Sequence, residues 1–311
     1  MANAETAPFQ FFRLQVDRTR RLGPSLVRVT FTGEDLTSFA SGGRDQSLSL
    51  FLPHPGQQAP VLPPLDDGAD MYAILGAWRA MPADERAVMR SYTVREQRPG
   101  PVGRTDGQTG GLSDGRTVGQ SDGRTDSPTG GQAEVDIDFA LHEDGGPAGR
   151  WARQASPGDR VVVLGPATPA NTAVRFQLPP DADSVLLWAD ETALPAAAAI
   201  LEWLPAGTPA QVYLEVPYSG DRIELTTEAD ATVTWLVREE GAPSAVDAVR
   251  AAELPGGAPY VWIAGESGSV KELRRHFVRE RELDRRRVTF VGYWRKGLSE
   301  DALRETPEDA A

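Results

Sequence analysis

The run "VLLWADETALPAAAAILEWL", residues 185–204, decides between a membrane span and one unit of an α/β domain. It is the most apolar window of the chain, but Asp190, Glu191 and Pro195 interrupt it, and charged groups are costly in a bilayer. We expect a strand that ends near Asp190 and then an Ala-rich helix, with Thr192 as its cap and Pro195 in its first turn. A dinucleotide pyrophosphate would sit at that turn, although the run has no G-x-G-x-x-G fingerprint.

The same alternation of strand and helix continues to the end of the chain. We expect strands at 210–216, 232–238, 260–265 and 287–294, and helices at 244–253 and 269–282. Alternating elements of this kind predict a mainly parallel sheet covered by helices. We place this α/β domain at residues 181–311.

Residues 1–180 have a different pattern, with short alternating runs bounded by Gly, Pro or Asp. They predict an antiparallel Greek-key β-barrel, with brief helices near 81–89 and 146–154. The expected strands are 9–22, 26–33, 47–53, 90–95, 134–142 and 159–165. A barrel followed by an open α/β sheet favours ligand binding between the two, at the carboxyl ends of the parallel strands.

Residues 101–132 interrupt the barrel pattern between two strands. They repeat "SDGRT" and contain few apolar side chains, so they cannot bury enough surface to order themselves. We expect a disordered surface insertion, whose added loop-closure entropy of about 2 kcal/mol a barrel tolerates.

Composition excludes several classes of site. The chain has no cysteine, so disulfides, thiol catalysis and cysteine-ligated clusters are ruled out. Its three histidines, His54, His142 and His276, have no metal-ligand spacing, and we predict no bound metal. The first residues lack a secretory signal, and with no membrane span expected we predict a cytoplasmic protein.

Charge is distributed unevenly along the chain. The formal net charge of -13 disfavours nucleic acid as a partner. Residues 271–296, however, hold ten Lys or Arg and four Asp or Glu, a net charge of +6. This local basic region predicts binding of an anionic small molecule.

The stretch "RSYTVR", residues 90–95, has an unusual composition for a strand. Alternation puts Arg90 and Tyr92 on one face and Ser91 and Thr93 on the other. A guanidinium can hold a pyrophosphate, an aromatic ring can lie along a flat heterocycle, and a hydroxyl can reach its ring nitrogens. The same residues also fit a barrel strand with exposed arginines.

Two glycine-containing turns each lead into a predicted helix. "GGPAGRWARQ", residues 145–154, would present free backbone amides to an anion, although such a run also forms ordinary turns. The second turn contains Gly265, and on the helix after it Glu272, His276 and Arg279 share a face beside the core positions. That face also fits a solvated surface.

With these segments in order, the chain resembles the siderophore-interacting protein family within the ferredoxin-reductase-like superfamily. The resemblance rests on "RSYTVR", "DIDFALHEDGGPAGRWA", "ADETALPA", "AGESGSVKELRRH" and "VGYWRKG". It implies an FAD-binding barrel, an NAD(P)H-binding α/β domain and reduction of ferric siderophores. Hydride would pass from nicotinamide to the flavin and single electrons to chelated Fe(III), so no acid-base residue is required.

The resemblance also implies which residues bind each group. The flavin residues would be Arg90, Ser91, Tyr92, Thr93, His142, Gly146, Pro147, Ala148, Gly149 and Trp151, and most relatives have Ser where Gly149 stands. The nicotinamide nucleotide residues would be Asp190, Glu191, Thr192, Ala193, Gly265 and Glu266. The chelate residues would be His276 and Arg279, with Arg295 or Lys296 compensating for Ser49, where many relatives carry lysine.

Some alternatives stay open at this stage. Glu215 would accept from a ribose 2′-hydroxyl and favour NADH, whereas Arg222 or Arg238 would meet the 2′-phosphate of NADPH. The resemblance favours NADPH. The rival functions are a general flavin reductase with another acceptor and a non-catalytic siderophore carrier, and we expect a monomer in each case.

Overall fold

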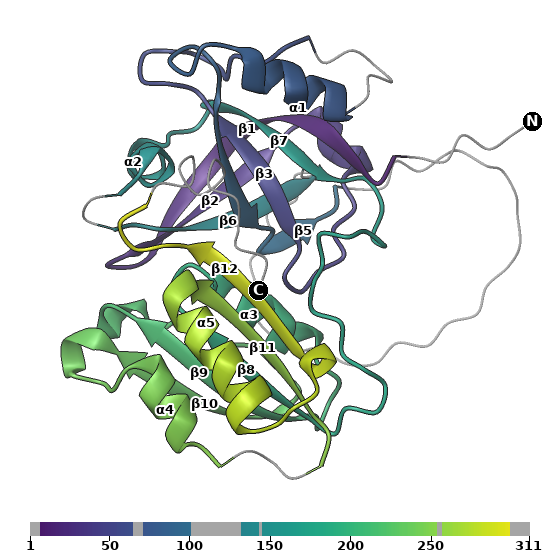
Figure 1. Ribbon diagram of the computed structural model, residues 1–311. Coiled ribbons are helices and arrows are strands. Elements are labelled where there is room, and N and C mark those ends of the chain that lie inside the picture. The colour runs from purple at the N-terminus through teal and green to yellow at the C-terminus, as the bar shows by residue number, and fades with distance from the viewer. Residues whose placement is uncertain (1–6, 65–70, 101–131, 143–144, 254–256, 299–311) are drawn as a thin grey trace, which may run out of the picture.

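The computed structural model describes residues 7–64, 71–100, 132–142, 145–253 and 257–298, which form two sheets in succession (Figure 1). The first sheet ends at Pro166 and the second begins at Ser184. The predicted domain boundary near residue 180 falls between them. The predicted insertion, apart from Gln132, lies outside the described residues.

The first sheet has seven strands in the order β4-β3-β7-β1-β2-β6-β5, and every pair in it is antiparallel. It curls into an open barrel (Figure 1), which confirms the predicted architecture. Its strands are β1 (Phe9–Gly23), β2 (Leu26–Thr32), β3 (Ser47–Leu52), β4 (Val88–Thr93), β5 (Glu96–Arg98), β6 (Glu134–Ala140) and β7 (Arg160–Pro166).

Alternating side chains fill the barrel, as the sequence pattern predicts. On β6, Val135, Ile137 and Phe139 are fully buried in the interior cluster. Helix α2 (Pro147–Gln154), which was also predicted, packs Ala148 and Ala152 against the same cluster. These contacts fix the start of α2 beside the end of β6.

The helix predicted near 81–89 is wrong. A turn occupies residues 83–85, and Val88 and Met89 are extended because they pair with β3. The helix lies just upstream as α1 (Met71–Ala80), which packs Trp78 edge-on against Phe51 of the barrel at 5.8 Å.

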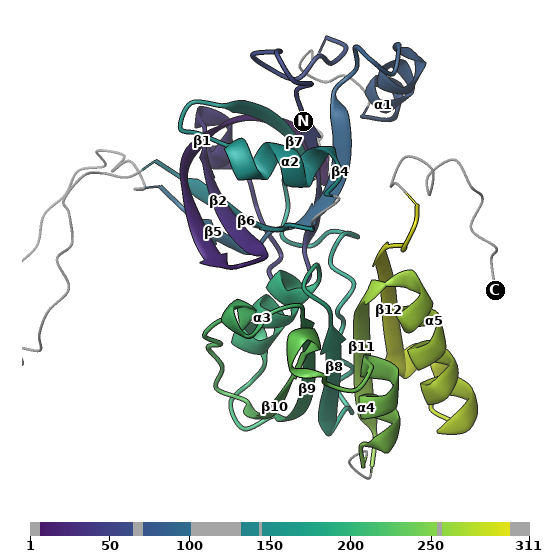
Figure 2. The same ribbon diagram turned by 90° about the vertical axis from the view of Figure 1, so that its left-hand side faces the viewer.

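The second sheet is parallel throughout, with the order β10-β9-β8-β11-β12. Helix α3 covers one face, and α4 and α5 cover the other (Figure 2). The elements are β8 (Ser184–Ala189), α3 (Leu194–Trp203), β9 (Pro209–Val216), β10 (Asp230–Val237), α4 (Ala245–Ala251), β11 (Pro259–Glu266), α5 (Ser267–Arg275) and β12 (Val288–Trp294). In the described part of the chain, no helix has the length and apolarity to cross a bilayer.

Helix α3 is apolar on nearly every side because it lies between the sheet and the barrel. All eight residues from Leu194 to Leu201 are buried, and their cluster includes Leu26 of the barrel. This explains why residues 185–204 form the most apolar window of the chain.

Polar contacts pin the two sheets to each other. The buried Asp45 carboxylate accepts from the backbone N–H of Phe176 at 2.9 Å and from Trp262 Nε1 at 3.0 Å. Asp221 accepts from the Ser25 backbone N–H at 2.8 Å and its hydroxyl at 2.7 Å. Because buried carboxylates that lose their partners are costly, these bonds fix the relative position of the sheets. We call these contacts the seam.

Candidate functional site

A cleft of about 1570 Å³ lies between the barrel and the carboxyl ends of the parallel strands. Its volume exceeds the range of about 300–1,000 Å³ that is common for one small-molecule site, so it has room for two ligands. The barrel contributes β4, the end of β6 and the start of α2, and the α/β sheet contributes α5 and β12.

Strand β4 is the edge of the barrel sheet on this side. Its pairing with β3 sets Arg90 opposite Leu50 and Tyr92 opposite Leu48, so both side chains share one face. Arg90 is 8% exposed, lines the cleft and donates from Nη1 to the Met89 carbonyl at 2.7 Å. Half-buried Tyr92 packs on Phe139 with ring centroids 4.4 Å apart.

The start of α2 opens into the same cleft. Gly146 is the N-cap, no side chain caps it, and Pro147 occupies the first turn. A Cβ built on Gly146 would meet nothing within 4 Å, so a ligand can approach the backbone amides closely. Ala148 and Gly149 line the cleft, whereas Trp151 stacks on Phe31 with rings 6.2 Å apart.

Asp190 connects the ends of three parallel strands. Its Oδ1 accepts from the Thr192 N–H at 2.9 Å, the Thr192 hydroxyl at 2.6 Å and the Ala193 N–H at 3.3 Å. Its Oδ2 accepts from the Glu266 N–H at 2.8 Å and Trp294 Nε1 at 2.7 Å. Burial, and then repulsion from Glu191, raise the pKa of Asp190 to about 7 against these hydrogen bonds. The backbone amides of the turn before α3 therefore already donate hydrogen bonds to the Asp190 carboxylate.

Gly265 lies directly against this carboxylate. Its φ of +145° is rarely adopted by other residues, and a Cβ there would come within 2.6 Å of Asp190 Cγ. Glu266 then caps α5 by accepting from the Ser269 N–H at 3.0 Å. The turn predicted beside the nicotinamide thus requires glycine for two separate reasons.

Aromatic side chains line part of the cleft. Trp294 is half-buried, and its ring lies 5.4 Å from that of His142, which follows β6. Burial raises the pKa of the Tyr293 hydroxyl, and its hydrogen bond with Thr93 of β4 acts in the opposite direction. The ends of β12 and β4 therefore meet here.

Glu191 does not line the cleft but forms a charge network beside it. Its carboxylate, 1% exposed, binds Arg238 through two hydrogen bonds of 2.7 and 3.0 Å. Arg238 also donates to Glu215 at 2.9 Å, and His142 Nδ1 lies 3.7 Å from Glu191. Burial acts to lower the pKa of Arg238, but contacts with Glu191 and then Glu215 outweigh it, and that pKa rises.

The opposite wall of the cleft is strongly basic. Arg279 and Arg295, both predicted as site residues, line it together with four further cations of the basic region predicted over residues 271–296, which were not predicted individually. The six cations of this basic wall are Lys271, Arg274, Arg275, Arg279, Arg285 and Arg295. Helical spacing from Lys271 could have identified Arg274 and Arg275, since positions three and four apart share a face.

His276 does not line the cleft. It is 4% exposed, and its Nδ1 lies 2.7 Å from Glu280 on the flank that faces α4. A π-helical turn over His276–Glu280 ends the helix here, and the position falls beside the buried Phe277. Lys296 contacts Glu266 through its backbone N–H, and neither it nor Ser49 is among the described lining residues.

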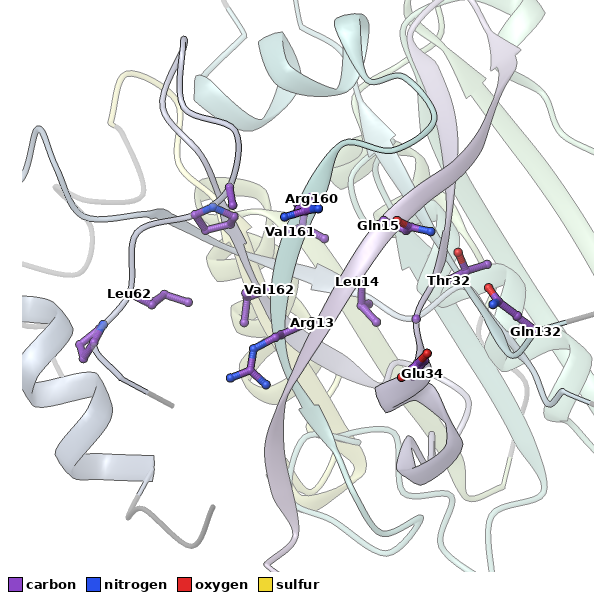
Figure 3. Close-up of a pocket in the computed structure, with 14 residues that line it drawn as sticks. Arg13, Leu14, Gln15, Thr32, Glu34, Leu62, Gln132, Arg160, Val161 and Val162 are labelled. Atoms are coloured by element: carbon purple, nitrogen blue, oxygen red, sulfur yellow. The ribbon is translucent and has the colours of Figure 1, made fainter. Parts of the chain in front are cut away.

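A second hollow of about 590 Å³ lies on the outer face of the barrel (Figure 3). Arg13 and Gln15 of β1 and Arg160 of β7 line it opposite Leu62. None of the site residues predicted from the sequence is among the described residues that line it. In the described part of the chain, no group of three or more His, Cys, Asp or Glu side chains is placed to hold a metal ion.

Comparison with known proteins follows the same division of the chain. Residues 182–297 match the family model "Siderophore-interacting protein", and residues 15–101 and 124–170 match "Siderophore-interacting FAD-binding domain". The NADPH-dependent ferric-chelate reductase of Escherichia coli is 30% identical over 92% of this chain and 93% of its own. The chain belongs to the siderophore-interacting protein family.

Other members agree over nearly the whole length. Ferric vibriobactin reductase ViuB of Vibrio cholerae is 28% identical over 93% of this chain and 90% of its own. A solved siderophore utilization protein from T. fusca is 33% identical, with a TM-score of 0.68 over 95% of this chain and 96% of its own. The siderophore-interacting family thus covers both walls of the cleft.

Proposed function

We propose that the protein is an FAD-containing reductase that takes electrons from NAD(P)H and passes them to ferric siderophores. Support comes from one observation above all: a single cleft brings the flavin-type strand β4 and the ends of the parallel strands to a wall of six cations. Relatives named as ferric-chelate and ferric vibriobactin reductases support the same activity.

The barrel side of the cleft fits a flavin dinucleotide. The open space over Gly146 would admit a diphosphate to the amides of α2, and the Arg90 guanidinium on the same wall would add charge. Tyr92 offers a half-buried ring for the flat heterocycle, and Ser91 and Thr93 offer hydroxyls. When bound, FAD supplies the conversion between two-electron and one-electron transfer.

The chain's own residues then position the two substrates. Gly265 and Glu266, fixed by Asp190, shape the turn where the nicotinamide would bind, and Trp294 closes it. The basic wall would draw in an anionic iron chelate and hold it beside the flavin. Because siderophore oxygens bind Fe(II) more weakly than Fe(III), reduction releases the metal. No proton has to be moved by a side chain.

We also propose the finer details of this assignment. The two domains are residues 1–180 and 181–311. The protein acts as a monomer, because one chain supplies both walls of the cleft, and it works in the cytoplasm, where NAD(P)H is available. Light scattering during size-exclusion chromatography tests the monomer.

Anaerobic stopped-flow spectroscopy tests the function directly. Protein reduced by NAD(P)H is mixed with ferric citrate, a ferric trihydroxamate or a ferric tris-catecholate, and we expect at least one to accelerate flavin reoxidation. Lack of acceleration by any chelate favours the general flavin reductase. A colourless protein that takes up no FAD favours the carrier. Arg90→Ala should lose bound flavin, and full retention of flavin would contradict the proposed site.

A further inference from the structure

The order of the parallel sheet indicates where the adenosine half of a dinucleotide lies. The chain enters the sheet at β8, moves out to β9 and β10, and returns to β11 and β12 on the other side. A dinucleotide binds across the switch point between β8 and β11. With Gly265 and Trp294 on the nicotinamide side, the adenosine ribose faces the ends of β9 and β10.

The residue at the end of β9 is the one that ordinarily meets the ribose. An acidic side chain about 20 residues beyond the first turn accepts from the 2′-hydroxyl of NADH, and an arginine nearby accommodates the 2′-phosphate of NADPH. Here Glu215 lies near the end of β9 and Arg238 directly follows β10. Both alternatives are therefore present, and their contacts decide between them.

Arg238 is already shared by two carboxylates. It binds Glu191 through two hydrogen bonds and Glu215 through one of 2.9 Å. The Glu191 side chain is 1% exposed, so moving the guanidinium to a phosphate would strand a buried carboxylate. Glu215 is 20% exposed, and a carboxylate has lone pairs for further donors such as ribose hydroxyls.

The charges around Glu215 also favour a ribose hydroxyl over a phosphate. Ser219, just beyond β9, is held by Glu239 through its N–H and its hydroxyl at 2.7 Å. Arg222, the other candidate cation, is paired with Glu240 at 2.6 Å. The carboxylates Glu191, Glu215, Glu239 and Glu240 thus outnumber the guanidiniums Arg222 and Arg238 by four to two. We call these six residues the acidic edge.

A 2′-phosphate carries a charge of about -2 near neutral pH. At the acidic edge it would face a net charge of the same sign, whereas a 2′-hydroxyl would donate to Glu215 without displacing any contact. We propose that the electron donor of this protein is NADH rather than NADPH, and that Glu215, oriented by Arg238, is the residue that determines this specificity. The inference rests on the proposed function and differs from the donor named for the Escherichia coli relative.

Equilibrium binding to the flavin-loaded protein tests the proposal without turnover. The probes are 5′-AMP and 2′,5′-ADP, which differ only in the 2′-phosphate, titrated by isothermal calorimetry. We expect 5′-AMP to bind at least about tenfold more tightly, the equivalent of one well-made polar contact. Tighter binding of 2′,5′-ADP overturns the inference, and so does failure of both probes to bind.

Glu215→Gln isolates the carboxylate charge. The variant keeps the side-chain length and leaves the Glu191 pair with Arg238 intact, so we expect an unchanged melting temperature. The preference for 5′-AMP should fall about tenfold, and the KM ratio of NADPH to NADH should fall with it. Glu228→Gln, before the amino end of β10, is the matched control and should leave both ratios unchanged. Equal ratios in Glu215→Gln and the wild type overturn the role of Glu215.

The outcome is separable from that of the proposed function. If NADPH reduces the protein faster than NADH does, and the protein still reduces ferric chelates, the NADH proposal is wrong and the proposed function stands. A protein that prefers NADH and 5′-AMP but reduces no chelate keeps this inference and loses the siderophore assignment.

Discussion

The basic wall lines the cleft, whereas none of the six residues of the acidic edge is among its described lining residues, and the two regions differ in how their charges are paired. The basic wall presents six cations, including the exposed Lys271 and Arg275, to the cleft. The acidic edge pairs its two guanidiniums with carboxylates, including the buried Glu191. Exposed charge of one sign attracts a ligand from a distance, whereas paired charge selects by contact. On the proposed function, the basic wall therefore attracts the iron chelate and the acidic edge selects the electron donor.

The largest expected effect comes from reversing the basic wall. In Lys271→Glu/Arg275→Glu, kcat/KM for an anionic ferric chelate should fall about 100-fold because attraction becomes repulsion. Flavin content and reduction by NADH should not change. The control is Arg20→Glu/Arg79→Glu, which reverses two exposed arginines of the barrel domain. A loss of equal size in the control would show that net charge, not the wall, attracts the chelate.

A smaller but still large effect should follow from Gly265→Ala near the end of β11. The added Cβ would lie within 2.6 Å of Asp190 Cγ at a φ of +145°. Strain of about 1–3 kcal/mol should lower the melting temperature and raise the KM for NADH about tenfold. The chelate KM measured at saturating NADH should remain unchanged. An unaltered NADH KM would mean that the turn does not position the donor.

The acidic edge can be weakened without touching Glu215. Glu240→Gln removes the partner of Arg222, and that guanidinium then becomes available to a 2′-phosphate. Since exposed ion pairs contribute about 0–1 kcal/mol, the KM for NADPH should fall about two- to threefold. Steady-state kinetics with both donors measures the change, and Glu253→Gln, just beyond the end of α4, is the control. A rise in the KM for NADPH would contradict the proposed role of the acidic edge.

The smallest effect concerns charges away from the cleft. Hydrogen bonds from Arg18 and, after opposing burial, from Arg98 lower the pKa of Glu134 to about 2. A lowered pKa in the folded state gives stability that is present above about pH 4.5 and is lost as pH falls towards 2. Glu134→Gln should lack this part of the acid dependence in urea melts at pH 5, 4 and 3. If Glu134→Gln and the wild type lose stability equally as the pH falls, Glu134 does not contribute to the acid dependence.

Local pattern was enough to predict most of the fold. Alternation gave the antiparallel strands, and the switch to helical spacing after residue 180 gave the parallel sheet. It failed at α1, where the burial of Ile74 and Trp78 depends on a barrel surface formed by distant strands. Propensity near Met81 could not reveal that β4 begins at Val88 through its pairing with β3.

The site was predicted less completely, because several of its contacts join residues that are far apart in the sequence. The Arg90 to Thr93 strand is a local signal, and all four side chains line the cleft. The network of Glu191, Glu215 and Arg238 joins residues 23 to 47 positions apart, which no local pattern reveals. His276 was placed by i, i+3 spacing to Arg279, and the π-helical turn breaks that spacing.

The seam has a consequence for engineering this protein. Asp45 and Ser25 belong to the barrel, while their partners Trp262 and Asp221 belong to the nucleotide half. A chimera that takes one half from a relative would remove the hydrogen-bond donors of Asp45 and Asp221, unless the residues on both sides of each bond are transferred together. The two halves are therefore exchangeable only as a matched set, and donor preference is better altered by point substitutions at the strand tips than by swapping modules.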